Sequence, residues 1–183
     1  MIKYRPKEVD FMYTLFLDTH DELITVALYS EKNIIVKDRE SYHSHAVYFV
    51  PMIRDILREN DLTVKNIKDI VCVNGPGSFT GLRIGLSVAK TLAIYLISSL
   101  ESYLVSSNLN GKKMCVIEDT KGYYISGDGI EEQYVTDISK YNDYVIVDKS
   151  LDIEKVVKCA LSKTSVNPHL VRANYVKEIE VLK

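Results

Sequence analysis

The stretch "NGPGSFTGLRIG", residues 74–85, contains residue types that could cradle a phosphate or form a catalytic turn. A P-loop ends in glycine, lysine and a hydroxyl residue, because its lysine must reach the β- and γ-phosphates. Here Leu82 and Arg83 follow Gly81, and Thr80 stands where the dinucleotide fingerprint needs its third glycine. Both phosphate-binding patterns are therefore incomplete, although exposed amides at the start of a helix could still bind an anion.

A nucleophile elbow of the G-x-S-x-G type is not present either. Pro76 and Gly77 precede Ser78, which is the wrong order, and no histidine is close in sequence. Ser78 or Thr80 is expected to cap the following helix, because hydroxyl oxygens accept hydrogen bonds from the first free helix amides. The motif thus predicts a tight turn that starts a helix. The turn comprises Gly75, Pro76, Gly77, Ser78, Phe79 and Thr80.

The histidine and cysteine residues offer little further chemistry. His43 and His45 are two positions apart, so an extended segment would let them share a metal, but no third ligand is apparent. We expect both histidines to face solvent. Cys72, Cys115 and Cys159 are odd in number and far apart, and we expect buried, reduced thiols. No catalytic residue and no metal site is therefore predicted.

Composition limits the class of protein. The chain has 183 residues, of which 46% are hydrophobic and 26% charged, as in one globular domain or two small lobes. A net charge of −2 gives no basic field for direct binding of nucleic acid. Residues 1–10 are polar and unlike a signal peptide, and no apolar run reaches the length of a membrane helix. These features predict a cytoplasmic protein without membrane contact.

Hydrophobic spacing predicts the strands that position the motif. Strands are expected at 13–18, 23–29 and 34–37, and their short connections predict an antiparallel meander. A further strand at 69–74 leads directly into the motif. Its β-branched residues are typical of a strand that is buried on both faces of a sheet.

A helix is expected over 44–60, with Pro51 kinking it or ending its first turn. One side carries a continuous apolar stripe, whereas Tyr48 and Met52 lie on another side. Because a helix on a sheet needs a single apolar stripe, these two residues predict a second neighbour. The expected core-facing residues are Ala46, Phe49, Val50, Ile53, Ile56 and Leu57.

The helix that follows the motif is expected from residue 80 into the nineties. Its polar stripe is narrow and consists of Arg83, Ser87 and Lys90. A helix that is apolar nearly all round is covered nearly all round. Small residues repeat every four positions and form a strip where another backbone could approach, which would offset the roughly 1 kcal/mol that each helical glycine costs. The strip comprises Gly81, Gly85 and Ala89.

The second half of the chain predicts a smaller lobe that is rich in strands. A hairpin turns at 120–122, a strand follows at 143–148, and a helix covers 151–163. The tail, 167–183, is expected to form a late strand or a docking segment. The complete pattern indicates a mixed α/β protein.

The segment "GPGSFTGLRIG" followed by "LSVAKTLA" resembles the signature of the TsaB (YeaZ) family of bacterial proteins. "LFLDT" and "VALYS" are similar to the first hairpin of that family, "HSHAVYFVPMIRDIL" to its first helix and "VNPHLVRANYVKEIEV" to its closing segment. The resemblance implies an α/β actin-like ATPase (ASKHA, RNase H-like) fold with two lobes, the second one reduced. It divides the chain into an N-terminal extension (1–10), an N-terminal actin-like lobe (11–100) and a small C-terminal lobe (101–183).

The chain also departs from the family pattern. Between "AKTLA" and "SSLE" roughly half a dozen residues are missing, so the fifth strand is expected to be shortened or replaced by helix. The hairpin "DTHDELIT" has no glycine, whereas the phosphate hairpin of actin-like phosphotransferases is rich in glycine and hydroxyl groups. Asp18 and Thr19 are therefore the only candidates for binding a cofactor, in a phosphate loop that looks degenerate.

The resemblance implies a role in forming threonylcarbamoyladenosine (t6A) beside the anticodon of tRNA. In this family the protein pairs through its first two helices with the TsaD transferase subunit, which carries the metal, while TsaE supplies ATPase activity. We therefore expect a catalytically inactive activator of TsaD that has no cofactor of its own. Its contact with tRNA is expected to be indirect only. Binding of ATP or ADP at the partner interface is a further possibility that the sequence does not decide. The predicted contact residues are Tyr48, Met52, Gly81, Leu82, Gly85, Leu86 and Ala89.

Three alternatives stay open. An ATP-binding enzyme of the actin-like kinase or ATPase type would follow from the fold alone. A metallopeptidase-like protein would need a metal cluster or a nucleophile beside a base. A homodimer would use the same apolar helix face as the heterodimer.

Overall fold

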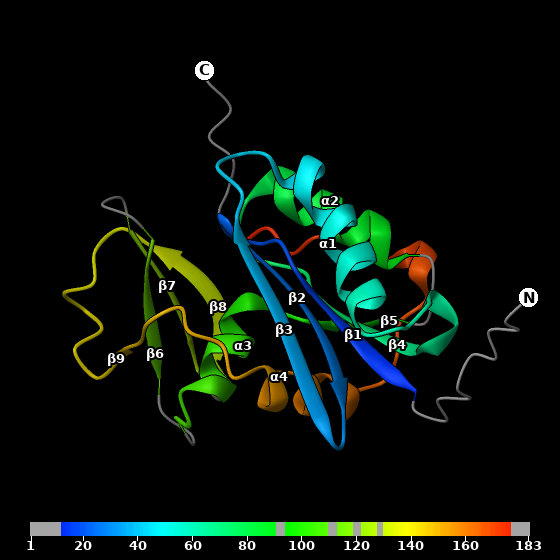
Figure 1. Cartoon of the computed structure of the whole chain (residues 1–183). Coiled ribbons are helices and arrows are strands. Elements are labelled where there is room, and N and C mark those ends of the chain that lie inside the picture. The colour runs from blue at the N-terminus through cyan, green and yellow to red at the C-terminus, as the bar shows by residue number, and fades with distance from the viewer. Residues whose placement is uncertain (1–11, 91–93, 110–112, 119–121, 128–129, 177–183) are drawn as a thin grey trace, which may run out of the picture.

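Figure 1 shows the computed structural model of the chain, whose described residues are 12–90, 94–109, 113–118, 122–127 and 130–176. The larger sheet has five strands in the order β3-β2-β1-β4-β5. They are β1 (Tyr13–Asp18), β2 (Leu23–Ser30), β3 (Asn33–Glu40), β4 (Ile67–Val73) and β5 (Ile94–Ile97). The first three form the predicted antiparallel meander, which is confirmed, and β4 runs parallel to β1 and β5.

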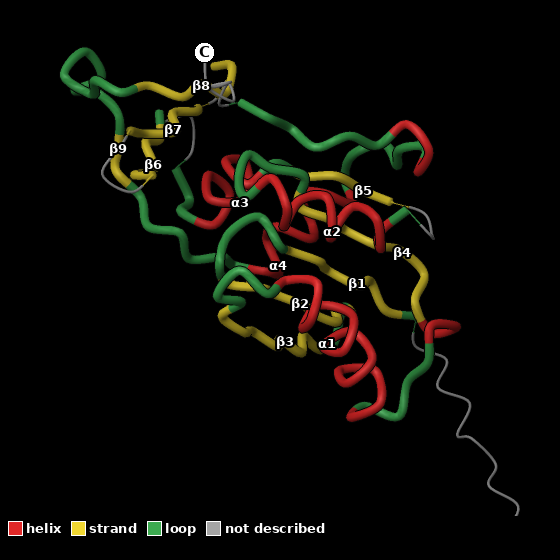
Figure 2. Tube along the Cα trace, turned by 90° about the horizontal axis from the view of Figure 1, so that it is seen from above, coloured by secondary structure: helices red, strands yellow, loops and turns green. Residues whose placement is uncertain are grey.

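Two helices, α1 (His45–Glu59) and α2 (Phe79–Ala89), cover one face of this sheet. Seen from above in Figure 2, they lie side by side, and they contact each other directly. Side chains alternate along β1, so Leu15 and Leu17 join the core under these helices, whereas Phe16 points to the opposite face. The sheet is thus buried on both sides.

Both helices confirm predicted elements. α1 continues through Pro51 to Glu59, so this proline lies inside the helix and beyond its first turn, not at the end of that turn. α2 ends at Ala89, with Lys90 as its C-cap, and so does not reach the nineties. Ser78 is the N-cap of α2, and its hydroxyl oxygen accepts a hydrogen bond from the backbone N–H of Gly81 at 3.2 Å, as predicted.

The predicted orientation of α1 is wrong at three positions, one of which is Ala46, expected to face the core but exposed. Met52 was expected on a second, outward side, but it is 6% exposed and packs in the core. Val50 was expected to face the core, but it is 54% exposed. The buried stripe runs in steps of three and four residues from His45 through Phe49 and Met52, and this register turns Val50 outward.

The opposite face of the larger sheet is covered by α4 (Ile153–Leu161). Its buried residues Val156, Val157 and Ala160 pack with Phe16 of β1, as the predicted apolar side of this helix requires. The sequence assigns α4 to the lobe 101–183, yet its packing partners belong to the first sheet. The division into lobes stays a prediction, but the chain clearly returns to the larger sheet at α4.

The smaller sheet has four strands in the order β8-β7-β6-β9. They are β6 (Met114–Glu118), β7 (Gly122–Gly127), β8 (Ile130–Val135) and β9 (Val145–Ile146). The antiparallel pairing of β6 and β7 confirms the predicted hairpin, whose turn at 119–121 falls outside the described residues, and β9 confirms the later strand. Strand β8 was not predicted.

Helix α3 (Ser99–Ser106) connects the two sheets. Leu100 and Tyr103 on this helix pack against Met114 and Val116 of β6. Strand β5, at Ile94–Ile97, has four residues before α3 begins, so the alternative of a helix in place of the fifth strand is wrong. Two short 3-10 helices also occur in the described part of the chain, at Val64–Asn66 and Pro168–Leu170.

The tail confirms the docking alternative for its described part, 167–176, and so does Val166 directly before it. Val166 forms an isolated antiparallel bridge with Ile94, to whose carbonyl oxygen it donates a hydrogen bond of 2.9 Å. The backbone N–H of Asn174 donates to the carbonyl oxygen of Asn74 at 2.7 Å. The remaining predicted tail, 177–183, lies outside the described residues.

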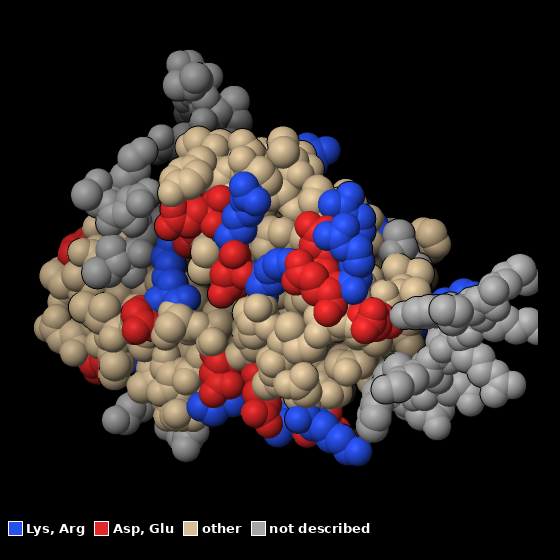
Figure 3. Space-filling model, in the orientation of Figure 1, with Lys and Arg blue, Asp and Glu red and all other residues tan. Residues whose placement is uncertain are grey.

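Charged side chains of both signs alternate on the face seen in Figure 3, in keeping with a net charge of −2. In the part of the chain that the structure describes, no helix is long and apolar enough to span a membrane.

Candidate functional site

The hairpin 18–22, which links β1 to β2, lies against the motif turn. A Cβ atom on Gly77 would overlap with the carbonyl oxygen of His20, and one on Gly81 would overlap with that of Thr19. A Cβ atom on Gly85 would overlap with the hydroxyl oxygen of Thr19. All three contacts fall below the 3.0 Å that real Cβ atoms keep, so side chains are excluded there. The motif glycines therefore admit a hairpin of the same chain.

Hydrogen bonds fix this contact. The backbone N–H of Ser78 donates to the carbonyl oxygen of His20 at 2.6 Å, and the hydroxyl of Thr19 donates to the carbonyl oxygen of Gly81 at 2.8 Å. Asp18 and Thr19, the predicted cofactor candidates, are only 2% and 1% exposed. An amide at the start of α2 that an anion could have used is thus already bound by the hairpin.

A buried chain of polar side chains starts in the same hairpin. The Nδ1 atom of His20 lies 2.6 Å from Oδ1 of Asp18, and its Nε2 atom lies 2.6 Å from the hydroxyl of Tyr103 on α3. Burial opposes the charged imidazolium, but the carboxylate of Asp18 outweighs it and raises the pKa of His20. Burial also raises the pKa of the Tyr103 phenol, with a further contribution from Asp18. The hairpin is thereby tied to the helix between the sheets.

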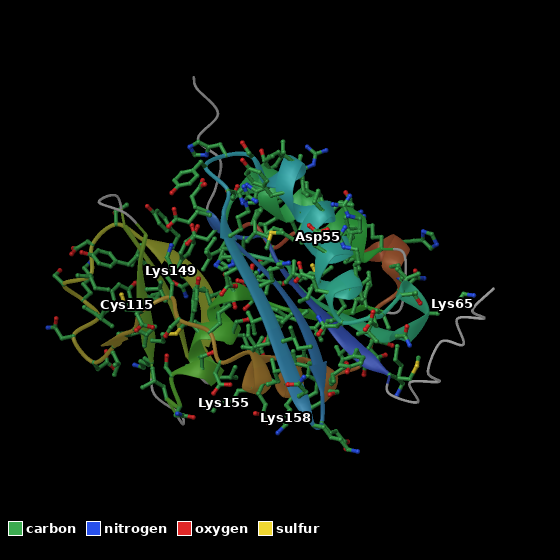
Figure 4. The ribbon with its side chains drawn as sticks, viewed as in Figure 1. Asp55, Lys65, Cys115, Lys149, Lys155 and Lys158 are labelled. Carbon is green, nitrogen blue, oxygen red and sulfur yellow. The ribbon has the colours of Figure 1, made fainter. Side chains whose placement is uncertain are left out.

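An ion pair connects the hairpin to the second half of the chain. Nζ of Lys149 lies 2.6 Å from Oδ2 of Asp21, and Figure 4 shows Lys149 in the region between the two sheets. Burial opposes ionisation of Asp21, but Lys149 outweighs it and lowers the pKa of this carboxyl. A cavity of about 390 Å³ opens beside the pair and is lined by residues of the hairpin, the motif turn, α3 and the smaller sheet, among them His20, Ser78, Tyr103, Tyr124 and Lys149.

The prediction that both histidines face solvent is wrong for His45. His45 is 3% exposed, and its Nε2 atom lies 2.8 Å from the carbonyl oxygen of Asp21, because the first turn of α1 packs beneath the hairpin. His43 is exposed, as predicted, and its Nδ1 atom lies 2.9 Å from Oε1 of Glu22. Among the described residues no group of three histidines, cysteines or carboxylates could hold a metal ion.

The cysteines largely follow the prediction. All three are free; Cys72 and Cys115 are buried, and Cys159 is half-buried. Burial raises the pKa of each thiol. Because the thiolate is the reactive form and a raised pKa favours the thiol, we expect these three cysteines to be unreactive.

The predicted contact residues on α2 face the interior of this chain. Leu82 is fully buried, and Leu86 is 4% exposed. On α1, Met52 is buried as well, and Tyr48 is half-buried beneath Arg39, whose guanidinium carbon lies 3.7 Å from its ring centroid. The hairpin and the sheet of the same chain thus occupy the small-residue strip of α2, and partner contact through its residues stays a prediction. The residues concerned are Gly81, Leu82, Gly85, Leu86 and Ala89.

The opposite face of α2 is open. Phe79 is 46% exposed, and on α1 Val47 and Val50 are 63% and 54% exposed. A groove of about 390 Å³ runs along this outer helix face, with a lining that is mainly apolar. Its lining residues are Ala46, Phe79, Thr80, Arg83, Ile84, Ser87 and Val88. A contiguous apolar surface of this kind marks an interaction site more often than isolated exposed residues do.

The strand order and helix placement define a protein of the actin-like, RNase H-like α/β fold. A crystal structure from Pseudomonas aeruginosa, described as an uncharacterized protein with similarity to peptidase YeaZ, has this fold with a TM-score of 0.70. It is 18% identical and covers 91% of this chain and 100% of its own. The family model for TsaD, tRNA N6-adenosine threonylcarbamoyltransferase, matches residues 33–163.

Curated relatives narrow this class further. The tRNA threonylcarbamoyladenosine biosynthesis protein TsaB of Bacillus subtilis (strain 168) is 31% identical over 140 residues, which are 69% of this chain and 61% of the relative. The protein of the same name from Escherichia coli (strain K12) is 34% identical over 83 residues, which are 45% and 36%. The chain belongs to the TsaB (YeaZ) family. It spans less than two thirds of the length of these relatives.

The buried chain from Asp18 through His20 to Tyr103 was missed from the sequence. His20 lies in "THDE", which looks like an ordinary polar turn, and Tyr103 follows 83 positions later. One signal was available: a histidine two residues after a strand-ending aspartate can bond to it locally. Nothing in the spacing could have indicated Tyr103.

Proposed function

We propose that this chain takes part in t6A biosynthesis as a non-catalytic partner and activator of a TsaD-type transferase. The observation that carries the proposal is the open apolar groove on the outer face of α1 and α2. The curated relatives of this chain are named as tRNA threonylcarbamoyladenosine biosynthesis proteins, which supports the assignment to t6A biosynthesis.

The kind of partner follows from the matched region. Residues 33–163 match the TsaD family model, and this range includes α1 and α2. A TsaD-type protein is therefore expected to present a related pair of helices, which could pack against this pair about a pseudo-twofold axis. Such packing would bury the exposed Val47, Val50 and Phe79.

The hairpin supports a non-catalytic role over the kinase or ATPase alternative. The space between β1 and α2 is filled by direct contacts of Thr19 and His20 with the motif, and a nucleotide phosphate there would have to displace them. ATP or ADP at the partner interface, and a TsaE-type ATPase as a third subunit, remain predictions of the same proposal. Contact with tRNA is expected through the transferase only.

The first test is the mass of the complex. The chain would be mixed with the TsaD-type protein of the same organism, with and without ATP, and followed by light scattering during size exclusion. Ser87→Arg places a large charged side chain in the groove, where Ser87 is exposed and bonds only within its helix. Ser162→Arg, at the exposed C-cap of α4 on the other side of the sheet, is the matched control.

A heterodimer that is lost in Ser87→Arg and kept in Ser162→Arg supports the proposal. If the chain alone forms a dimer that Ser87→Arg disrupts, and no mixed complex forms, the same face serves a homodimer. A mixed complex that tolerates Ser87→Arg overturns the assignment of the groove.

A further inference from the structure

The C-terminal segment 166–176 crosses the motif turn between the two sheets. Val171 is buried in the core of the larger sheet, and Val176 packs against the core of the smaller one. Between them, the carbonyl oxygen of Asn174 would lie 2.6 Å from a Cβ atom on Gly75, whose φ of +107° also requires glycine. The first glycine of the motif is therefore shaped to receive this segment.

A half-buried carboxylate holds the segment from the smaller sheet. Glu132 on β8 accepts hydrogen bonds from Nδ2 of Asn174, at 2.8 Å, and from the hydroxyl of Ser98. Burial raises the pKa of the Glu132 carboxyl, and both hydrogen bonds act against this change. Hydrogen bonds to an ionised acceptor are roughly twice as strong as neutral ones. Glu132 is thus placed to clamp Asn174 onto the turn.

The residue after the clamped asparagine, Tyr175, contacts a side chain that lines the open groove. Tyr175 stacks on Phe79 with ring centroids 5.3 Å apart and an angle of 27° between the rings. The guanidinium carbon of Arg83 lies 5.3 Å from the centroid of the Phe79 ring. Phe79 and Arg83 both line the groove, and both aromatic rings are close to half exposed. We call these three side chains the aromatic edge.

The chemistry of the aromatic edge suits protein binding. Tyrosine and arginine are the side chains most enriched, with tryptophan, among residues that dominate binding energy. Arg83 forms no ion pair among the described residues. A partner that fits this edge offers apolar side chains to the rings and a carboxylate to Arg83.

We propose that Glu132 is a positioning residue for partner binding: by holding Asn174, it fixes Tyr175 beside Phe79, and the aromatic edge extends the groove as one binding surface. The occupant is the TsaD-type transferase, because the edge is continuous with the groove assigned to that subunit. This inference rests on the proposed function and adds the C-terminal segment and the second lobe to it.

The test measures the dissociation constant of the full-length chain and the TsaD-type protein by titration calorimetry. Tyr175→Ala is expected to weaken binding about tenfold. Leu170→Ala is the matched control, since Leu170 lies in the same segment and is 75% exposed but is not part of the edge; binding should stay within about twofold of the wild type. If wild type and Tyr175→Ala bind the TsaD-type protein with equal affinity, the aromatic edge is not part of the binding surface.

A double-mutant cycle tests the role of Glu132. Glu132→Ala should weaken binding about as much as Tyr175→Ala, and adding it to Tyr175→Ala should change little more, because both act through one side chain. Glu132→Gln keeps an oxygen that accepts from Asn174 and should restore most of the affinity. Losses that add in the double variant would show a general structural effect and overturn the positioning role.

Hydrogen exchange separates the clamp from the proposed function. In the chain alone, Glu132→Ala should speed amide exchange in residues 172–176, whereas Glu131→Ala, at the exposed neighbouring position, should not. If the exchange rates of residues 172–176 are unchanged in Glu132→Ala, Glu132 does not hold Asn174 in place, and this conclusion does not depend on partner binding. If the wild type does not bind the TsaD-type protein, the proposed function and the partner assigned to the edge both fail, while accelerated exchange would still uphold the clamp.

Discussion

The two faces of α2 differ in what they contact. Its inner face is made of glycine, alanine and leucine residues that pack on the hairpin 18–22 and on the sheet of the same chain. Its outer face presents Phe79, Arg83 and Ile84 to an open groove. Both faces carry apolar residues, yet the inner one is used in folding, and we propose that the outer one binds a partner.

This difference shows that a strip of small residues indicates close packing but does not identify the segment that packs against it. Gly81 and Gly85 are spaced as in a helix pair, but the atoms that lie closest to them belong to Thr19. We propose that a partner instead contacts the side that carries large, half-exposed residues. Substitutions on the inner face should therefore affect stability, and those on the outer face should affect binding.

The largest effect is expected for Gly81→Ala. Alanine in place of a helical glycine normally stabilises by about 1 kcal/mol. Here the new methyl group would overlap with the carbonyl oxygen of Thr19, and backbone atoms cannot move aside without shifting the hairpin. We expect a loss of about 3 kcal/mol in the free energy of unfolding, measured by urea denaturation. Ser87→Ala, on the exposed face of the same helix, should stay within about 0.5 kcal/mol.

A Gly81→Ala variant as stable as the wild type would contradict the distinction between an inner face used in folding and an outer face used in binding. It would mean that the hairpin does not rest on the inner face of α2 in solution. The small-residue strip would then be free for a partner, as the sequence alone suggests.

The next effect concerns the outer face. Phe79→Ala removes a ring that is 46% exposed and contacts mainly Tyr175 and Arg83, so the fold should lose little stability. Affinity for the TsaD-type protein should fall by about 2 kcal/mol, or roughly 30-fold, because exposed aromatic residues at the centre of a contact dominate binding energy. The measurement is a calorimetric titration at constant temperature. Val64→Ala, exposed on a distant 3-10 helix, serves as control, and equal losses in both variants would contradict the assignment.

The sequence predicts most of the fold because its signals are local. The meander, the helix that contains Pro51 and the N-cap Ser78 follow from spacing and from hydroxyl chemistry within a few residues. The predicted register of α1 is wrong at Ala46, Val50 and Met52, since both sides of that helix carry apolar residues and periodicity alone does not choose between them. Strand β8 was not predicted because its sequence, "IEEQYV", is largely polar.

The contacts that shape the site are non-local and could not be predicted in this way. Tyr103 meets His20 across 83 positions, and Asn174 reaches Glu132 across 42. His45 is buried only because the hairpin lies above it. Each of these pairs depends on how the sheets are placed, which hydrophobic spacing does not determine.

The third prediction concerns the buried histidine behind the inner face. His20→Gln leaves Asp18 with a poorer partner and should cost about 1 to 2 kcal/mol near neutral pH. The pKa of His20 is raised in the folded chain, so its stabilising effect is complete below the unfolded value of about 6.5 and is lost as pH rises through the folded value. The difference in unfolding free energy between wild type and variant should therefore be largest below about pH 6.5 and shrink as the pH rises above it.

Urea denaturation at pH values below and above about 6.5 provides the measurement. His43→Gln is the control, because the side chain of His43 is 92% exposed and its pair with Glu22 should contribute little. A difference for His20→Gln that grows with pH would show that burial, and not Asp18, decides the charge of this imidazole.

The smallest effect is expected for Ser78→Ala, at the boundary between the two faces. The Ser78 hydroxyl caps α2 by accepting from the N–H of Gly81, and removing such a cap costs about 1 kcal/mol. Thr80→Ala is the control for stability, since Thr80 is exposed and its side chain is not the cap of α2, so the change should remain within about 0.5 kcal/mol. Because Ser78 bonds inward, to α2 and to His20, Ser78→Ala should lower the melting temperature without changing the affinity for the partner. If affinity fell while stability held, the motif turn itself would belong to the binding surface, and the division between a folding face and a binding face would have to move by one turn of the helix.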